Sequence, residues 1–580
     1  MQVKKAAVAA LSVAALVGLA ACSGSGDSSS SGDSATFEEA GDAGKDQDAS
    51  RVDGPVEVEG AVEGGTINVL SNAGLTTMDP SEAYYINTMS FHNSFVTRSL
   101  TQYVYDPETE QTVLIPDLAV DLGTPNEDFT EWTFELRDGI KYENGDEVQP
   151  EDWIWGIKRS FDRDTFPGGA AYSNEYFQDG DSYKGPYTDP DAEWNGATIE
   201  GNKLTIKMAK PFPDMPYWGT FPAMSPMPED ASDPEEYRQH PLATGPYMFG
   251  DYTPGESLQL VRNPEWDPAT DPGRTAYPDE YQFDLTEDSS ALDAKIIGDQ
   301  GDAQTTMTFD SVLQSDYPAA QETGNVVTGG VPCTRFLYLD MRKITDLDVR
   351  KAIGYAFPYK DYWLTGGEIV GVTRIPGTTI MPPGVPGQPD YDVLGTNGDT
   401  TDPEKAKQLL QEAGEEGYQL DFVFAADDPI QVDIKNTYVE AFEEAGFTAN
   451  PIASTINKIP TQNLNPDTPI NLRSGGWCSD WPKGSSWIPP LFGPNGGSNY
   501  SMFDEKKITD GIQDVIQSPL EEQDAGWGAL DEQIMTEYYP VVNAGFYGNA
   551  MLHGSRVMGM ENDDVAGMPT WKQMWVQPEE

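Results

Sequence analysis

The stretch that decides the fold class reads EWTFELRDGIKYENGDEVQPEDWIWGIKRSF and covers residues 131–161. Apolar and polar side chains alternate over residues 132–137, which is typical of a strand with one buried face. An Asp-Gly pair at residues 138–139 then supplies a turn, and the alternation resumes with Ile140 and Tyr142. A turn of this composition between two alternating runs predicts a β-hairpin.

A helix is predicted directly after this hairpin. Pro150 stands where a helix begins, because the first helical position makes no use of its backbone N–H. Trp153, Ile157 and Phe161 then recur every four residues and therefore lie on one face of a helix. We expect these side chains to lie in a core rather than to contact a ligand.

Strands and helices alternate unevenly along the rest of the chain. Residues 66–70 are predicted as a strand. Asp346 precedes apolar residues at helical spacing, and a further helix has Asp402 as its N-cap, Pro403 in its first turn and Gly414 as its stop. Long stretches rich in Pro, Gly and Asp separate these elements, without a repeat of fixed period. The sequence therefore predicts an α/β protein with elaborate loops.

Composition narrows the class of function. The chain has 580 residues, several times the usual domain length of about 100 to 200. Its formal net charge is −61, so repulsion from phosphates opposes nucleic-acid binding as the main function. The three histidines, His92, His240 and His553, lie far apart, and we expect no metal site and no cofactor. The enzyme alternative that remains is a secreted glycosidase with paired carboxylates, since serine-hydrolase and zinc-protease motifs are missing from the sequence.

The N-terminus predicts export. Lys4 and Lys5 precede an apolar run over residues 6–20, which is typical of a secretory signal and short for a membrane-spanning helix. The order Leu-Ala-Ala-Cys ending at Cys22 resembles the lipobox of bacterial lipoproteins, in which that cysteine is acylated, for example with palmitate. We therefore predict a signal peptide over residues 1–21 and a lipid-anchored, extracytoplasmic protein. An ordinary cleaved signal with a chance cysteine is the alternative.

A tether is predicted between this anchor and the folded part. Residues 22–63 consist largely of Ser, Gly, Asp, Ala and Glu with one aromatic residue, Phe37. Such a segment buries too little apolar surface to offset the conformational entropy lost on ordering. We expect it to hold the folded part away from the membrane.

Several segments resemble, in their order along the chain, the family 5 extracellular solute-binding proteins, which serve ABC importers of peptides and nickel. The resemblance covers roughly residues 64–560. The segments that carry it are residues 78–80, 115–119, 132–145 with Asp152, 243–247, and 334–340 leading into 348–352.

The resemblance implies a type II periplasmic-binding-protein-like fold. Two α/β lobes joined by a hinge enclose the ligand, and an extra domain is inserted in the first lobe, as in the group called cluster C. On this chain the resemblance implies lobe I at residues 64–105, 241–332 and 540–580, the extra domain at residues 106–240, and lobe II at residues 333–539.

Residues 473–481, RSGGWCSDW, resemble the oligopeptide-binding branch of this family. In that branch an Asp at the place of Asp480 receives the α-ammonium group of the ligand. A Cys at the place of Cys478 pairs with a Cys ahead of an aromatic strand, which here is Cys333, so the resemblance implies a disulfide. The cysteine count agrees, because lipidation of Cys22 leaves two thiols in an oxidising compartment. Two separate buried thiols are the alternative.

Further candidate ligand contacts lie near Asp480 or near the cleft that the resemblance implies. Arg473 is separated from Trp477 by one residue more than the branch pattern, so it either contacts a peptide carboxylate or lies at the surface. For the aromatic candidates, core packing is the alternative to ligand contact. The remaining candidates are Trp477, Trp481, Trp487, Tyr84, Tyr85 and Asn87.

The function implied by the resemblance is that of a monomeric binding protein, not an enzyme. Its lobes close around an oligopeptide, and an ABC permease in the membrane recognises the closed form. The membrane is contacted only through the lipid anchor, and the sequence does not specify the peptide length. An oligosaccharide or another small solute such as chelated nickel in the same fold, and a surface adhesin or peptide chaperone, are the alternatives.

Overall fold

The computed structural model describes residues 47–55, 57–72, 74–75, 77–106, 109, 111–494 and 496–579 of the chain. The predicted signal peptide and Cys22 lie outside the described residues. Part of the predicted tether, residues 47–55 and 57–63, belongs to the described residues and makes contacts with the folded body. There the Arg137 guanidinium donates to the carbonyl oxygen of Val52 at 2.7 Å. Backbone hydrogen bonds hold this polar segment in place although it has few apolar side chains.

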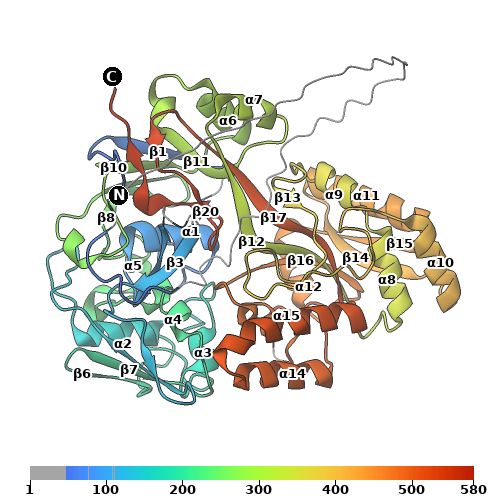
Figure 1. Cartoon of the computed structure of the whole chain (residues 1–580), viewed down its shortest axis with the longest axis horizontal. Helices are drawn as coiled ribbons and strands as arrows, with labels where there is room; N and C mark the ends of the chain where they lie inside the picture. The colour runs from blue at the N-terminus through green and yellow to red at the C-terminus, as the bar shows by residue number, and fades with distance from the viewer. Residues whose placement is uncertain are drawn as a thin grey trace, which may run out of the picture. The chain divides into compact units, whose positions relative to one another are not determined.

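A nine-stranded mixed sheet forms the centre of the fold (Figure 1). The predicted strand over residues 66–70 is confirmed as β1, which pairs in parallel with β10 on one side and β11 on the other. The strands follow the order β16 (Leu472–Cys478), β12 (Val326–Leu339), β17 (Val541–His553), β11 (Thr306–Ser311), β1 (Thr66–Leu70), β10 (Glu280–Asp284), β9 (Ser257–Arg262) and β8 (Tyr247–Thr253), with β13 (Arg374–Ile375) beside β17.

The strands β12 and β17 are long enough to belong to both halves of this sheet. The first half of β12 pairs with β17 near β11, and its second half pairs with both β17 and β16. The pairing register shifts between Val331 and Phe336, where the extra residues bend the strands. Figure 1 shows the two strands running side by side from the group around β1 to the group around β14 and β16.

A second sheet of four strands corrects the predicted hairpin. Trp132, Phe134 and Leu136 are buried as expected, but β5 pairs with β7 and β4 rather than with residues 140–142. The Asp-Gly turn is therefore a local bend, and a strand about 70 residues away supplies the partner. The sheet has the order β4 (Thr124–Pro125), β5 (Glu131–Glu135), β7 (Lys203–Lys207) and β6 (Ala197–Glu200).

The helix predicted after this segment is confirmed as α2 (Pro150–Arg159). Trp153 and Ile157 are buried on one face of it, and Phe161 is buried just beyond its end. The Gln149 and Asp152 side chains cap its first turn reciprocally. Around it lie short elements that the sequence did not indicate, namely β2 (Thr101–Asp106), β3 (Gln111–Pro116), α3 (Tyr172–Tyr176), α4 (Met215–Trp218), η3 (Pro222–Met224), η4 (Glu229–Ala231) and α5 (Pro234–Tyr237).

The other two predicted helices are confirmed as α8 (Leu347–Ala356) and α10 (Pro403–Ala413). Asp346 and Asp402 accept hydrogen bonds from the first-turn N–H groups, and Gly414 ends α10 in the left-handed conformation. They pack beside a parallel pair of strands. The elements of this part are α9 (Tyr359–Thr365), β14 (Gln419–Ala425), α11 (Pro429–Glu444), β15 (Thr448–Ser454), η7 (Ile456–Lys458), α12 (Ile459–Leu464), η8 (Gly484–Ser486), α13 (Ile488–Phe492), α14 (Lys506–Gln517) and α15 (Leu520–Glu537).

The remaining elements surround the part of the central sheet near β1. They are α1 (Ile86–Phe91), the π-helical turn η2 (His92–Val96), η5 (Pro268–Thr270), α6 (Ser289–Gly298), η6 (Gly301–Thr305), α7 (Tyr317–Thr323), β18 (Val557–Met558), β19 (Asn562–Asp563), β20 (Met568–Pro569), η9 (Trp571–Gln573) and β21 (Trp575–Val576).

Buried apolar side chains gather in three large clusters. One, which we call core A, lies between residues 67–96, 243–307 and 551–576. Core B covers residues 100–224 and also takes up Trp481. Core C covers residues 336–544. Because Trp481 belongs by sequence to the range of core C but packs in core B, the loop that carries it joins two cores.

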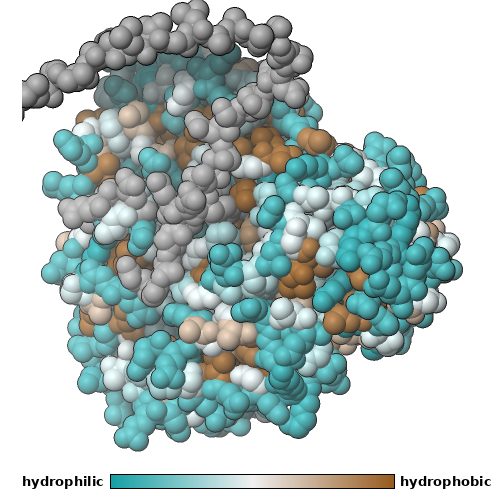
Figure 2. Space-filling model, turned by 45° about the vertical axis from the view of Figure 1, so that its right-hand side comes forward, coloured by the Kyte–Doolittle hydropathy of each residue, from teal (hydrophilic) through white to brown (hydrophobic). Residues whose placement is uncertain are grey.

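The surface agrees with the acidic composition. The face drawn in Figure 2 is mostly hydrophilic, with scattered apolar patches. Within the described part of the chain, no helix combines the length and hydrophobicity that a membrane span requires. The same part contains no group of three His, Cys, Asp or Glu side chains placed to hold a metal ion.

Candidate functional site: a cavity between Asp480 and the C-terminal segment

Asp480 lies just beyond β16, with its half-buried carboxylate against two tyrosines. The Tyr172 hydroxyl donates a hydrogen bond to it, and the Tyr84 hydroxyl forms a second one. Burial raises the pKa of Asp480 to about 6, although both hydrogen bonds act in the opposite direction. Among the described residues no Lys, Arg or His side chain pairs with this carboxylate. Asp480 is thus a partly desolvated negative charge that lacks a cationic partner in the described protein.

Asp480 is part of the wall of a cavity of about 60 Å³. On this measure one water molecule needs about 10–15 Å³, so the cavity has room for a few water molecules. Its walls come from residues 89–90 and 93–94 where α1 passes into η2, residues 103–105 of β2, Thr220, residues 479–480, and residues 563, 565–566 and 569–573 near the C-terminus. Segments separated by several hundred residues therefore meet around one cavity.

The predicted disulfide is present between Cys333 and Cys478. The two cysteines face each other directly in the β12–β16 ladder, with Cα atoms 4.0 Å apart. The alternative of two separate thiols is wrong. Because Cys478 is two residues before Asp480, the disulfide fixes the end of the strand from which the carboxylate projects.

The loop after the disulfide is fixed by its tryptophans. Trp481 is buried in core B with its ring centroid 4.8 Å from that of Tyr172. Trp487 is buried in core C and donates to the Ser479 hydroxyl at 3.0 Å. The half-buried Trp477 donates to the Ser486 carbonyl oxygen at 2.7 Å. None of these three tryptophans is part of the cavity wall, and all three are held by packing.

A buried carboxylate of core B reinforces the same loop. Asp214 accepts hydrogen bonds from the Ser485 and Trp481 side chains, and Lys483 lies near it. Burial raises the pKa of Asp214 to about 6. The loop that carries Asp480 is therefore attached by hydrogen bonds as well as by Trp481 to the part of the protein that holds Tyr172.

Arg473 has a structural role that the sequence did not reveal. Its side chain is fully buried, so the alternative of a surface arginine is wrong. The guanidinium donates to the carbonyl oxygens of Asn463 and Asn465 at 2.7 and 3.0 Å and lies 3.2 Å from a carboxylate oxygen of Asp340. Because these partners occupy it, we do not include Arg473 among the proposed ligand contacts.

The three predicted ligand contacts near the start of α1 lie in different surroundings. Tyr84 is the partner of Asp480 described above. Tyr85 is 62% exposed and lies in a separate surface hollow with Glu82 and Arg238. The Asn87 side-chain oxygen accepts the backbone N–H of Thr88 at 2.8 Å. Of these three predicted contacts, the structure brings only Tyr84 to Asp480.

Lys572 is a wall residue of the cavity that sequence reasoning missed. Its ammonium group donates to the Gln102 side-chain oxygen at 2.9 Å and to the backbone carbonyl oxygen of Tyr103. Burial, together with the positive charge of Arg274, lowers the pKa of Lys572 to about 7. No sequence motif marks this lysine, and only the fold brings it near the segment after β16.

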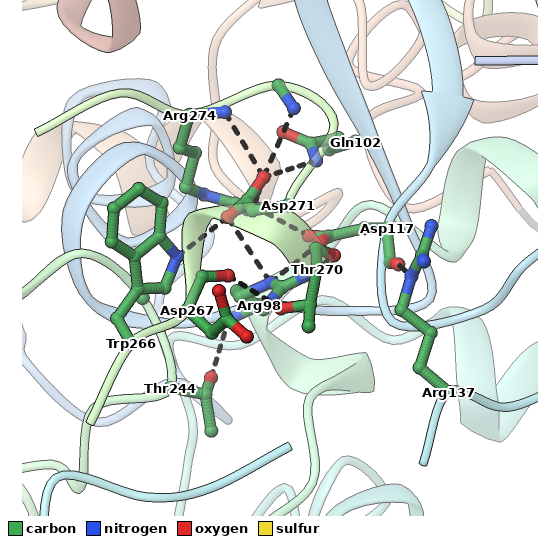
Figure 3. Close-up of polar contacts among 12 residues, drawn as sticks. Arg98, Gln102, Asp117, Arg137, Thr244, Trp266, Asp267, Thr270, Asp271 and Arg274 are labelled. Carbon is green, nitrogen blue, oxygen red and sulfur yellow. Dashed lines mark hydrogen bonds and ion pairs between the residues drawn. The ribbon is translucent and has the colours of Figure 1, made fainter. Parts of the chain in front are cut away.

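A cluster of four buried charges, Arg98, Asp117, Asp271 and Arg274, is drawn in Figure 3, and its charges act on Lys572. Arg98 and Arg274 each lie 2.8 Å from a carboxylate oxygen of Asp117, and both also pair with Asp271. Although burial opposes it, the two guanidinium groups hold the pKa of Asp271 well below its usual range. Two positive and two negative charges balance each other within the cluster. Gln102 joins it to Lys572, because its amide donates to Asp271 at 3.1 Å while its oxygen accepts from the lysine.

This architecture defines a ligand-binding protein: α/β lobes that share long strands surround a small cavity with charged walls. The sequence matches the family described as "Bacterial extracellular solute-binding proteins, family 5 Middle" over residues 113–499. The chain belongs to this family, as its sequence predicted, and it is a binding protein rather than an enzyme.

Curated relatives and solved structures agree with this assignment. The periplasmic oligopeptide-binding protein OppA of Salmonella typhimurium is 22% identical over 469 residues, which cover 76% of this chain and 80% of OppA. Heme-binding protein A of Haemophilus influenzae is 23% identical over 300 residues, 49% of this chain and 51% of that protein.

Among solved structures, a protein titled clavulanic acid biosynthesis oligopeptide binding protein 2 superposes with a TM-score of 0.80 at 22% identity, covering 92% of this chain and 99% of that one. The unliganded open form of the murein tripeptide binding protein MppA gives 0.67 at 17% identity, covering 89% and 98%. The predicted type II periplasmic-binding-protein-like fold is thereby confirmed.

Proposed function

We propose that this protein is the substrate-binding lipoprotein of an ABC importer and that it captures oligopeptides between its lobes. The observation that carries the proposal is the Asp480 carboxylate, which lines the cavity and has only tyrosine hydroxyls as side-chain partners in the described chain. A desolvated carboxylate is costly unless a positive charge joins it, and the α-ammonium group of a peptide brings both a charge and three donors.

The family and its relatives support a peptide as the ligand. OppA and the clavulanic acid biosynthesis protein are both named as oligopeptide-binding proteins. The alternative of sugar stacking on tryptophan gains no support, because Trp477, Trp481 and Trp487 all pack within the protein.

The proposed mechanism is closure of lobe I and lobe II about a hinge at the strands they share. Lobe I comprises residues 64–105, 241–332 and 540–580, and lobe II comprises residues 333–539, with the extra domain at residues 106–240. A ligand that contacts both lobes binds the closed form more tightly than the open form, and this difference in affinity stabilises the closed form. A monomer anchored through Cys22 after removal of residues 1–21 would present this closed form to the permease.

The decisive test is Asp480→Asn, assayed by calorimetry with free and N-acetylated peptides of several lengths. Loss of the carboxylate should weaken free peptides by about 2–5 kcal/mol, because the ligand ammonium group is then enclosed without its partner. N-acetylated peptides, which lack the charge, should bind weakly to both proteins and change little. Asp524→Asn is the matched control, since that carboxylate pairs with Lys483 at 3.0 Å and does not line the cavity. Equal weakening of free and acetylated peptides would refute the role of Asp480.

A further inference from the structure

The cavity has an unpaired charge of each sign in its wall. Asp480 contributes the negative charge, and the Lys572 ammonium group contributes the positive one. Lys572 uses two of its three donors on Gln102 and Tyr103, and no described carboxylate lies within ion-pair distance of it. The cluster of four buried charges does not supply a partner, because Arg98 and Arg274 already neutralise Asp117 and Asp271. Such a lysine favours an anionic group inside the cavity.

Asp563, the other carboxylate in the wall, is satisfied by its own surroundings. It accepts the backbone N–H groups of Val565 and Ala566 at 3.0 and 3.3 Å and the Thr112 hydroxyl at 3.2 Å. Burial raises its pKa, so its ionised form is disfavoured. Asp563 therefore fixes the C-terminal segment, and although it attracts Lys572 at longer range it forms no ion pair with the ammonium group.

Three more polar atoms in the same wall lack hydrogen-bond partners within the described chain. They are the side-chain oxygen of Asn93, the hydroxyl of Tyr103 and the indole N–H of Trp571. Buried polar atoms are nearly always satisfied, and each one left without a partner costs about 1–3 kcal/mol. An acceptor, a donor and a hydroxyl that can do both match the N–H and C=O groups of an amide.

We propose that this cavity takes a short zwitterionic ligand whose ammonium group binds Asp480 and whose carboxylate binds Lys572, with its amide groups meeting Asn93, Tyr103 and Trp571. This inference rests on the proposed function and deepens it by naming the ligand class as amino acids to tripeptides with both ends free. The small volume of about 60 Å³ favours the short end of that range. A longer peptide would have to leave the cavity or hold the lobes apart.

The two charges also lie on different parts of the protein. Lys572 lies within η9 between Trp571 and Met574, which pack in core A, whereas Asp480 follows β16 between cores B and C. A ligand that binds both groups joins the two parts, and a ligand that has lost one charged end does not. The same contacts therefore provide both length selection and the closure of the lobes.

The test compares free-acid and C-amidated alanine peptides, from one to five residues, by calorimetry on the full chain and its Lys572→Met variant. The wild type should bind the best free acid about 30-fold or more tighter than its amide, which is what loss of an enclosed charge partner typically costs. Lys572→Met should abolish this difference, and Lys572→Arg should restore part of it. Lys506→Met is the matched control, because that lysine is 85% exposed on α14.

Two further probes separate this inference from the proposed function. The compound 6-aminohexanoate has both charged ends but no amide, so its binding without any peptide binding would keep the zwitterion site and overturn the peptide function. Peptide binding in which acid and amide are equivalent would overturn the role of Lys572 and leave the peptide function intact. If Lys572→Met does not fold, the wild-type comparison of acid and amide decides.

The amide contacts have their own test. Trp571→Phe removes an N–H with little change in shape and should weaken dipeptides about 5- to 10-fold while leaving 6-aminohexanoate unchanged. An equal loss for both ligands would show that the indole acts only through packing.

Discussion

Removing the Cys333–Cys478 disulfide should lower the stability of the protein far more than it lowers ligand affinity. The link closes a loop of 145 residues. In the chain-entropy model such a loop restricts the unfolded chain by about 17 cal/mol/K, which corresponds to about 5 kcal/mol at 25 °C. This figure is an upper value, because residual structure in the unfolded chain reduces it.

Ligand affinity should change little because the β-ladder holds the same residues without the covalent bond. Seven consecutive residue pairs join β12 and β16, from Cys333 opposite Cys478 to Leu339 opposite Leu472. Asp480 continues this strand and is further held by Tyr172 and by the packing of Trp481. The disulfide therefore acts mainly on the unfolded state, and the site persists in the folded one.

The assay is urea unfolding of the oxidised protein, the reduced protein and the variant with Ala at both cysteines. The reduced protein is the matched control, because it keeps both sulfur atoms and loses only the link. Both altered forms should lose about 3–5 kcal/mol of unfolding free energy and agree with each other within about 1 kcal/mol. A loss below about 1 kcal/mol, or a loss of peptide affinity in a fully folded variant, would refute this reasoning.

The parts of the fold that sequence alone predicted are those fixed by local chemistry. The helix starts at Pro150, Asp346 and Asp402 were found because a cap and an apolar stripe lie within a few residues of each other. The partner of β5 was not found, because strand pairing is decided by packing between distant segments. The Asp138-Gly139 turn is a real bend, but the strand before it pairs with β7, and after it Lys141 forms only an isolated bridge with Glu147.

The part of the candidate ligand site that could be predicted lies in one segment of the sequence. The resemblance pointed to Asp480 and to the disulfide because both belong to, or pair with, residues 473–481. Tyr172 and Lys572 were not predictable, since among many charged and aromatic residues nothing local distinguishes them. The sequence did not show that Arg473 is buried. Its ion pair with Asp340 forms only when the strands β12 and β16 pair, and no local pattern near Arg473 predicts that pairing.

Two predictions remain. Affinity for a peptide with free ends should be highest near pH 6–7: below about 6 Asp480 gains a proton and loses its attraction for the ammonium group, and above about 7 Lys572 loses the charge that attracts the carboxylate. Calorimetry between pH 4 and 9 checks this, and a flat profile, or one unchanged in Asp480→Asn, would contradict it. Arg473→Met should lower the unfolding free energy by about 3 kcal/mol without changing peptide affinity, because it removes the buried one of the two guanidinium partners of Asp340 and leaves the carbonyl oxygens of Asn463 and Asn465 without this donor. Arg342→Met is its matched control: that arginine pairs with the same carboxylate at 2.7 Å but is 45% exposed, so its loss should cost less than about 1 kcal/mol. Equal losses in the two variants would show that burial of Arg473 does not set the strength of its interactions, and a fall in peptide affinity would return Arg473 to the ligand site.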